Sequence, residues 1–529
     1  MKKDVSILRE VLCLVFAAMI FGGIYILALP AIPGWGFMFV LAFALFLPGL
    51  IGVMTAYEFD QSTPVATVEL IASIVLVVYM IIAAIGGSSM FHAKTFANSF
   101  AIEHHESAKD DVPSFNNVTK VSLMDTESAK KLGDRTLGSL SDYVSQYDVA
   151  NEYTTISYQK KVMKVAPLVH GGFLKAMKND TIPGYVIVDT LTNEAKFVKV
   201  EGGIKYSPSA FFGKDLLRHI RSEYKDLLGE YYNFQIDEEG HPYWVVATFD
   251  YEVWHSCKVP VGAIIVDAVT GEMSKHKLDK LPEWVEQVVD GDTVTTLYNR
   301  HGELQNGFWN LSDEGKTQVT EDYGYVEKNG DIYIYTGVTS VAADESNIGF
   351  IMVNSRTGDC RYYPMAGAEE YSAMSAAEGV VQNYGYEASF PTLVMYGEIP
   401  TYVMVLKDSN GLVKKYAMVN MVNYTIVAVE DTLEDCQDSY VKAMEESGND
   451  GTVETEAEKK QKNKETIVIA SIEFVTVKGE TIVYVKSVDG KVFKQAFAKN
   501  EKLILLEVGQ EVEVEYSGEI KDITSASFK

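Results

Sequence analysis

Three long apolar runs near the N-terminus constrain this chain more than any other feature of its sequence. They are Val11–Leu29, Phe37–Thr55 and Val65–Ile85, and each has about the ~20 residues that a helix needs to cross a bilayer. Pro48 and Glu69 lie within the second and third runs, and transmembrane helices tolerate a proline kink and a carboxylate near the interface. We therefore predict three transmembrane helices within residues 1–90, rather than a cleaved signal peptide or three buried core helices.

The basic residues around these runs predict the orientation of the protein in the membrane. Lys2, Lys3 and Arg9 precede the first run, and the two connecting loops contain neither Lys nor Arg. Cytoplasmic segments carry an excess of Lys and Arg, so we expect the N-terminus in the cytoplasm. Three crossings then place everything after about Gly87 outside, although Lys94 and Lys109 weaken the bias. The expected location is an integral, multi-pass membrane protein with an extracytoplasmic body.

Charge separates the apolar head from the remainder of the chain. Residues 1–100 contain four basic and five acidic residues, so the remainder carries nearly all of the formal net charge of −27. Nucleic-acid binding depends on neutralising phosphates with Lys and Arg, and we therefore expect no nucleic-acid partner. The four cysteines, none in C-x-x-C spacing, predict neither a disulfide framework nor a cysteine metal site.

We predict a multi-domain protein with a strand-rich α+β body and a small all-β unit at the C-terminus. The expected organisation has six parts: the three-helix transmembrane region 1–90, a linker 91–112, a first α+β unit 113–345, a second α+β unit 346–439, a charged linker 440–465 and a small β-barrel 466–529.

Strands are expected to dominate the body, because alternating runs rich in Val, Ile and Tyr are bounded by Gly, Asp and Asn. Two helices are also predicted, at Asp215–Leu228, where apolar residues share one face, and at Glu369–Gln382, which starts with acidic residues. The strand predictions for the body are Gly184–Val188, Tyr243–Thr248, Ala263–Val266, Asp331–Tyr335, Phe350–Val353 and Tyr402–Leu406.

An internal repeat organises these strands. Residues 184–194, 262–272 and 349–359 each read as an apolar strand, Asp or Asn, two residues, Thr, Gly or Asn, and an acidic residue. The Asp or Asn side chain is expected to bond back onto the turn, and the Gly or Asn to take positive φ. Residues 415–420 begin a fourth, degenerate copy. The spacing is too wide for a solenoid and favours a duplicated α+β domain with unequal insertions.

The repeated turns and the helices before two of them resemble the PepSY-type module, a small helix-plus-sheet unit of bacterial envelope proteins and protease propeptides. The resemblance rests on Val266–Glu272 and Val353–Asp359 and covers two stretches within residues 176–430. It implies binding or regulation of another protein, and it assigns no catalytic residue.

The C-terminal segment 466–529 resembles an OB- or SH3-like barrel, because it holds five predicted strands in about 60 residues. Acidic residues outnumber basic ones there, which favours a structural or protein-binding role over nucleic-acid binding. The predicted strands are Thr466–Val475, Thr481–Ser487, Val492–Ala498, Glu511–Tyr516 and Ile520–Ala526.

Several groups of polar residues are candidates for sites, and each has a simpler interpretation. His104–Glu106 reads as a solvated linker, because adjacent side chains diverge. The polar stretch Tyr335–Ser340, leading to Asp344–Asn347, could hold a cation through oxygen ligands, but a hydrogen-bonded loop is favoured. His255 and Cys257 share a strand face without further support for a thiol enzyme. Glu369 and Glu370 diverge as helix neighbours.

No hydrolase, metalloprotease, nucleotide-binding or kinase motif is present in the sequence. We therefore predict no catalytic, cofactor-binding or metal-binding residues, and expect a membrane-anchored, non-enzymatic envelope protein whose partners are the lipid bilayer and another protein. One alternative is a cell-surface hydrolase whose site brings together His170, His219, His255 or Glu345. Another is a subunit of a membrane complex, with helix contacts at Gly22, Gly23, Gly49 and Gly52. The oligomeric state stays open.

Overall fold

The computed structural model describes residues 2–58, 64–229, 231–341, 343–447, 463–477, 480–497, 501–517 and 521–528. The chain forms two compact units, residues 1–450 and residues 451–529. Each unit is described by itself below.

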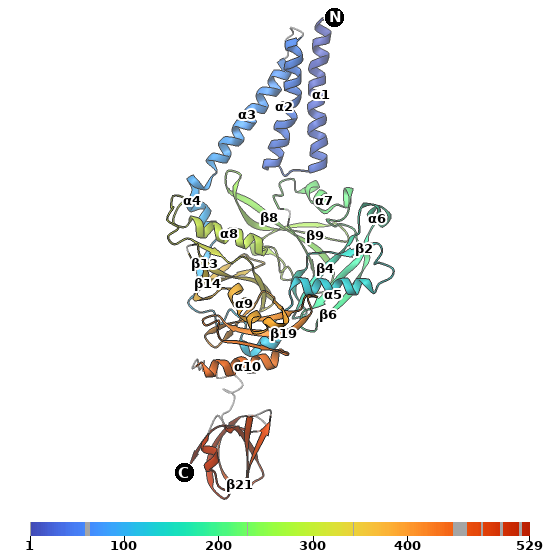
Figure 1. The fold of residues 1–529 in the computed structure, drawn as a ribbon. Coiled ribbons are helices and arrows are strands. Elements are labelled where there is room, and N and C mark those ends of the chain that lie inside the picture. Colours follow the sequence, from blue (N-terminus) through green and yellow to red (C-terminus); the bar gives the residue numbers. More distant parts are fainter. Residues whose placement is uncertain are drawn as a thin grey trace. The chain divides into compact units, whose positions relative to one another are not determined.

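The first unit begins with three long helices, α1 (Lys2–Ala28), α2 (Trp35–Glu58) and α3 (Pro64–Gly86) (Figure 1). All three are long and apolar enough to span a membrane, which confirms the prediction of three such helices. Most of their large apolar side chains are exposed in the protein alone. A bilayer would cover those side chains, so the helices are compatible with membrane anchoring.

Small residues let α2 and α3 pack closely. A Cβ atom at Gly49 would lie 2.8 Å from the backbone nitrogen of Leu70, and one at Gly52 would collide with Ala66. Glycine is therefore required at both positions for this approach. Gly49 and Gly52 were predicted as contacts for another protein, and the structure instead places them against α3 of the same chain. Gly22 and Gly23, in contrast, have open space around them.

The described residues of the body form four sheets. Apart from β1 (Ile102–His104), which joins the third sheet in parallel, the strands of each sheet lie in one continuous stretch of the chain and pair antiparallel. A helix precedes each sheet in the sequence: α5 (Thr126–Gly138), α7 (Leu216–Glu223), α8 (Gly291–Leu304) and α9 (Glu370–Val380).

The first two sheets share one apolar core, to which Tyr185, Leu216 and Trp244 contribute. The first sheet contains β2 (Tyr147–Val149), β3 (Thr154–Tyr158), β4 (Lys161–His170), β5 (Ile182–Asp189) and β6 (Glu194–Ile204). The second sheet contains β7 (Tyr232–Ile236), β8 (Pro242–Val253), β9 (Ser256–Asp267) and β10 (Met273–Lys277).

The third and fourth sheets share another apolar core, which includes Tyr335, Phe350 and Tyr402. The third sheet contains β1 (Ile102–His104), β11 (Thr317–Val319), β12 (Gly324–Lys328), β13 (Asp331–Ser340), β14 (Ala343–Asn354) and β15 (Cys360–Ala368). The fourth sheet contains β16 (Glu387–Ala388), β17 (Thr392–Tyr396), β18 (Ile399–Lys407), β19 (Val413–Asn420) and β20 (Val427–Glu430).

The repeated sequence motif closes the last hairpin of every sheet. Oδ1 of Asp189, Asp267 and Asn354 accepts hydrogen bonds from the backbone N–H groups two and three residues further on, at 2.7–3.1 Å. Asn420 does the same at 2.8 Å in the fourth sheet. The positive φ angles, 57°, 81° and 78°, fall on Asn193, Gly271 and Gly358. The expected turn chemistry is thus confirmed at all three complete copies of the motif.

The prediction of a linker over residues 91–112 is wrong. Residues Ser89–Asn98 form α4, and Ile102–His104 pair in parallel with Cys360–Tyr362 of β15. Ala108 and Val112 are buried in the core of the third and fourth sheets. The segment has few large apolar residues, and its partners β8, α8 and β15 lie far away in sequence, so its local pattern resembles that of a linker.

Two further boundaries differ from the predictions. The segment from Tyr335 to Asn347 was predicted as a polar loop, but β13 continues to Ser340 and β14 begins at Ala343. The predicted boundary after residue 345 therefore falls inside β14. The charged linker was predicted to begin at Tyr440, but α10 (Leu433–Glu446) continues past it and buries Tyr440 and Met444.

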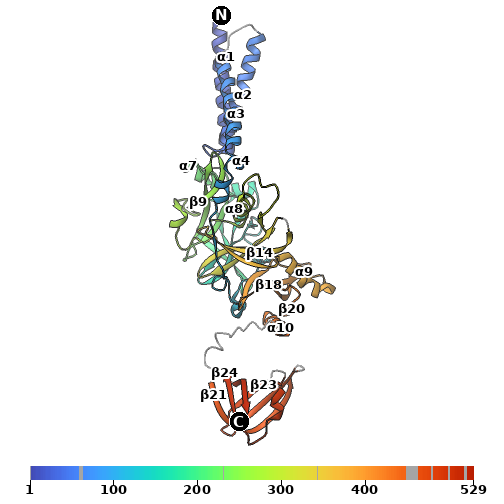
Figure 2. The same ribbon diagram turned by 90° about the vertical axis from the view of Figure 1, so that its left-hand side faces the viewer.

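The second unit has five strands that pair in the closed order β21-β22-β23-β25-β24 (Figure 2). The buried residues on β21 to β24 include Ile467, Val483, Phe493 and Val512. Ile520, at the start of the last predicted strand, lies outside the described residues. The strands are β21 (Asn463–Val477), β22 (Glu480–Ser487), β23 (Val492–Ala496), β24 (Glu511–Ser517) and β25 (Lys521–Phe528).

Candidate functional site

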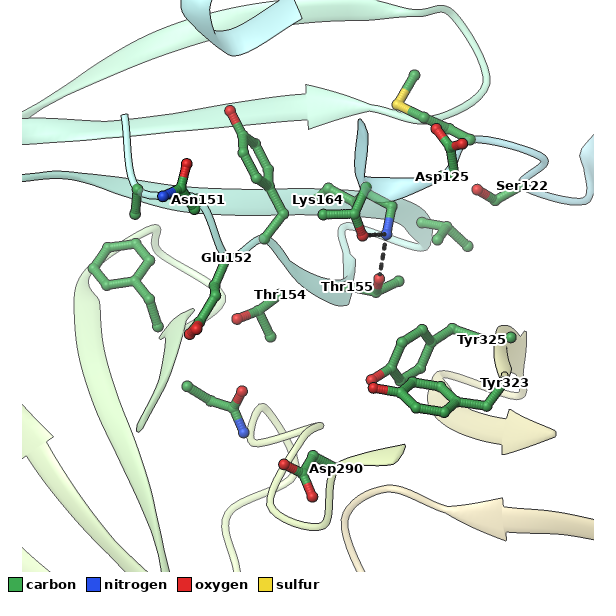
Figure 3. Close-up of a pocket in the computed structure, with 18 of the residues that line it drawn as sticks. Ser122, Asp125, Asn151, Glu152, Thr154, Thr155, Lys164, Asp290, Tyr323 and Tyr325 are labelled. Atoms are coloured by element: carbon green, nitrogen blue, oxygen red, sulfur yellow. Dashed lines mark hydrogen bonds between the residues drawn. The ribbon is translucent and has the colours of Figure 1, made fainter. Parts of the chain in front are cut away.

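A cavity of about 1500 Å³ opens between the first three sheets of the body. It forms where β3 meets both β7 and β13, and segments 121–126 and 390–392 complete its wall. The lining residues come from distant parts of the chain, and Thr392 contacts Ser122 across 270 residues of sequence. Figure 3 shows polar side chains pointing into this space from several strands.

Lys164, on β4, is a buried cation in the cavity wall. Its Nζ atom donates to Thr155 Oγ1 at 3.0 Å and lies 3.5 Å from Thr126 Oγ1 (Figure 3). Burial lowers the pKa of Lys164 to about 8, and the negative charge of Asp125 opposes this shift. Asp125 itself is the N-cap of α5 and forms an ion pair with Lys407. Lys164 is therefore held mainly by neutral hydroxyl groups, and its charge is only partly compensated.

Carboxylates dominate the charge of the lining. Asp290 is the N-cap of α8 and accepts a hydrogen bond from the backbone N–H of Thr293 at 2.8 Å. Burial raises the pKa of Asp290, and the nearby charge of Asp292 raises it further. Burial likewise raises the pKa of Asp322. The raised pKa values follow mainly from burial, which makes the charged form of these carboxylates costly. The acidic lining residues are Asp125, Asp148, Glu152, Asp290, Asp292, Asp322 and Glu327.

Tyrosines supply the aromatic part of the wall. Tyr323 donates its hydroxyl to Asp292 at 3.3 Å, and its ring is nearly perpendicular to that of Tyr325 at 5.8 Å. Burial raises the pKa of Tyr231, Tyr323 and Tyr325, so all three remain neutral hydrogen-bonding groups at physiological pH. Ring faces beside carboxylates are favourable surroundings for an ammonium or guanidinium group.

The structure does not bring the three histidines among the sequence-based hydrolase candidates together. His170 lines the cavity and contacts Asn179 O at 3.1 Å. His219 lies on α7 and bonds to Gly271 O at 2.7 Å. His255 lies at the tip of the β8–β9 hairpin, beside Trp35 and Tyr79 of the apolar helices. Glu345 is in β14, and its side chain lies outside the described residues. Within the described part of the chain, only His170 of these three histidines lines the cavity.

The other polar groups considered in the sequence have structural partners. The rings of His104 and His105 contact different tyrosines, Tyr362 and Tyr363, as expected for adjacent residues on a strand. Glu370 is buried and accepts from Gly337 N at 2.9 Å, and burial raises its pKa to about 7. Cys257 is buried. In the residues that the structure describes, no group of three or more His, Cys, Asp or Glu could hold a metal ion.

The residues that matter most in the cavity were missed in the sequence. Lys164, Asp290, Asp322 and Tyr323 were not singled out, because each lies in an ordinary strand, cap or turn pattern. The dense Glu-Asp-Tyr-Gly-Tyr stretch at 321–325 is the one local signal that could have drawn attention. It gives no indication of Lys164, which reaches the same cavity from a strand about 160 residues earlier.

Comparisons with known proteins do not assign this chain to a family. The sequence matches no known family profile, and no curated protein matches it. Among solved structures, the chain is similar to a B. megaterium levansucrase mutant at 11% identity, over 83% of this chain and 99% of that one, with a TM-score of 0.18. It is also similar to a Synechocystis apocarotenoid oxygenase mutant at 8% identity, over 51% of this chain and 47% of that one, with a TM-score of 0.14. Similarity at this level supports no conclusion about fold or function.

Proposed function

We propose that this chain is a membrane-anchored binding protein whose extracytoplasmic body captures a cationic segment of another protein in the acidic, tyrosine-lined cavity. The observation that carries the proposal is the combination of cavity size and lining charge. Small-molecule pockets are typically about 300–1,000 Å³, and this cavity is about 1500 Å³. An extended peptide segment fits a space of this size better than a small metabolite.

The chemistry of the wall selects Lys or Arg side chains. The carboxyl groups of Asp290 and Asp322 have raised pKa values, so an incoming cation would relieve the cost of ionising them in a partly buried site. Tyr231, Tyr323 and Tyr325 offer ring faces for cation–π contacts. A cationic ligand would lie on this side of the cavity, away from Lys164.

Membrane anchoring and orientation support the same function. An N-terminus with Lys2, Lys3 and Arg9, followed by three crossings, would place the body outside the cytoplasm. A strongly acidic body remains soluble beside an anionic membrane and attracts basic partners. The four helix-plus-sheet units with the same closing turn are consistent with duplicated PepSY-like modules, a resemblance that implies protein binding. The C-terminal unit, as an OB- or SH3-like barrel, would offer a separate protein-binding surface.

The test uses the full-length protein in lipid nanodiscs, with a fluorescein-labelled oligolysine peptide as the probe. The double variant Asp290→Asn/Asp322→Asn is expected to bind the probe about tenfold more weakly, because two carboxylate charges are lost. Asparagine remains a good N-cap at residue 290, so the fold is preserved. Fluorescence anisotropy measures the affinity.

Asp438→Asn is the matched control, because Asp438 is exposed on α10 and does not line the cavity. It should bind the probe as the wild type does. Equal affinity of the double variant and the control, or equal binding of oligolysine and oligoglutamate to the wild type, would overturn the proposal.

A second candidate function, hydrolysis, rests on one contact in the cavity wall. Ser209 Oγ lies 3.4 Å from His170 Nδ1, and His170 Nε2 lies 3.1 Å from Asn179 O. If Nε2 carries the proton donated to Asn179, Nδ1 is free to accept the proton of the Ser209 hydroxyl, as a nucleophile–base pair requires. A fluorophosphonate probe should then label wild type and Ser207→Ala, but not Ser209→Ala. Absence of label on wild-type Ser209 would exclude this candidate.

A further inference from the structure

The body is attached directly to the ends of the apolar helices. Arg218 of α7 donates to the carbonyl oxygens of Ile26 and Leu27 at 2.8 and 3.2 Å, and Arg221 donates to that of Leu29. The carbonyls of Ile26 and Leu27 belong to the last turn of α1, and that of Leu29 directly follows it. Two guanidinium groups satisfy them at the negative end of the helix dipole. α7 therefore lies against the C-terminal end of α1.

A second attachment fixes the other side of the body. At the tip of the β8–β9 hairpin, the carbonyl oxygen of His255 accepts from Trp35 Nε1 at the start of α2 (2.9 Å). His255 Nε2 lies 3.4 Å from the Tyr79 hydroxyl of α3. Trp254, next to it, is 60% exposed. Because α7 and this hairpin meet different helices, one end of the body is held against the ends of the apolar helices (Figure 1).

Large apolar side chains are exposed next to α7. Phe211 and Phe212 precede α7 directly, and the ring of Phe173, at the start of α6 (Phe173–Lys178), is perpendicular to that of Phe211 at 5.0 Å. Exposed fractions run from 41% for Phe211 to 81% for Leu174. We call this set the apolar patch: Phe173, Leu174, Met177, Phe211 and Phe212.

Basic side chains accompany the apolar patch, although the body as a whole is acidic. Lys175 and Lys178 lie on α6, and Lys214 directly follows the Phe211–Gly213 segment. Asp180 forms an ion pair with Lys214, so acidic neighbours compensate part of this charge. Apolar rings with lysines beside them are the composition of segments that lie in a membrane interface, where the rings enter the acyl boundary and the lysines reach phosphate groups.

We propose that the apolar patch inserts into the interfacial layer of the same bilayer that holds α1–α3, with Lys175 and Lys178 contacting the phosphates of anionic lipid headgroups. The patch continues the established contact between α7 and the end of α1, so the nearest surface available to cover it is lipid. Docking at this patch would hold the body in one orientation above the membrane. The inference depends on the membrane anchor and is independent of what the cavity binds.

The test measures the depth of residue 174 in the membrane. Leu174→Cys is labelled with bimane in the full-length protein, since the four native cysteines are buried. The protein is placed at one copy per nanodisc, with lipids that carry a nitroxide near the headgroup. Leu412→Cys is the control, because Leu412 is also exposed and lies in the turn between β18 and β19.

We expect nitroxide lipids to quench the bimane at residue 174 about threefold more than at residue 412. The substitutions Lys175→Gln/Lys178→Gln should reduce the quenching in discs with anionic lipid, and have little effect in zwitterionic discs. Equal quenching at the two positions would overturn the proposal. With one copy per disc, such a result would mean that the patch stays in water rather than in lipid.

Discussion

Replacement of Asp111 by alanine is expected to destabilise the body by about 3 kcal/mol, because it leaves two cations without their shared partner in a mostly buried site. Asp111 Oδ1 accepts from Arg361 Nη1 at 2.6 Å and from Lys328, and Oδ2 accepts from the Tyr363 hydroxyl at 2.6 Å. Its side chain is 15% exposed. The carboxylate therefore joins the segment before the body to β12 and β15 of the third sheet.

The neighbouring substitution Asp110→Ala is the control, because Asp110 is exposed. Thermal unfolding in detergent, followed by near-UV circular dichroism, should show a Tm lower by about 5 °C for Asp111→Ala and almost unchanged for Asp110→Ala. If the two variants have equal Tm values, the contacts of Asp111 with its three partners contribute nothing measurable to stability.

Acid should weaken the stabilising contacts of the Asp111 carboxylate. Burial alone would raise the pKa of Asp111, but hydrogen bonds from Lys328 and Tyr363 and the charges of Lys328 and Arg361 outweigh it and lower the pKa. A carboxylate whose pKa is lowered by folding stabilises the protein above its ordinary range near 3.8. That contribution disappears as the pH falls through the lowered value. The difference in Tm between wild type and Asp111→Ala should therefore shrink in strong acid.

Replacement of Glu286 by glutamine, in contrast to Asp111→Ala, is expected to stabilise the protein, by about 3 kcal/mol at neutral pH. Glu286 is 4% exposed and accepts a hydrogen bond from Ser157 N at 2.6 Å. Burial raises its pKa to about 9, and the charges of Asp331 and Glu327 add to the shift. Glutamine can accept the same hydrogen bond without the cost of a buried charge.

The pH profile distinguishes this effect from a change in packing. A carboxyl group whose pKa is raised by folding costs no stability when the pH is below its pKa in the unfolded chain, near 4.5. The cost then grows as the pH rises toward the folded value near 9. The stability gained by Glu286→Gln should therefore be small in acid and increase through neutral pH. Glu283 is exposed and nearby, so the stability of Glu283→Gln should depend on pH as that of the wild type does. The same pH dependence for Glu286→Gln would contradict the prediction.

Features with local causes were predictable from the sequence. The apolar helices follow from length and composition. The six strands named for the body in the sequence analysis are all present, because alternating runs rich in Val, Ile and Tyr favour strands, as at Tyr402–Leu406 of β18. The turns at Asp189, Asp267 and Asn354 were predictable because these side chains accept hydrogen bonds from backbone N–H groups two and three residues further on. The predicted helix Asp215–Leu228 was too long, because it ends at Glu223.

Features with distant causes were not predictable. Residues 102–104 form a strand only because β15 offers an edge 258 positions later, and no local pattern signals this pairing. The cavity arises in the same way. Lys164 lies on β4 of the first sheet, Asp290 at the start of α8 and Tyr323 directly before β12 of the third sheet. The sequence therefore shows three ordinary residues far apart instead of one site.

The parallel pairing of β1 with β15 has a consequence for biosynthesis. A ribosome releases residues 102–104 long before it reaches Cys360, and at roughly 5–20 residues per second the interval is tens of seconds. Throughout that time Asp111 is without Arg361, which follows it by 250 residues, and the edge of the nascent third sheet is incomplete. The third sheet therefore cannot be completed in the order in which the chain is synthesised. Most of the body must be made before its first strand can pair.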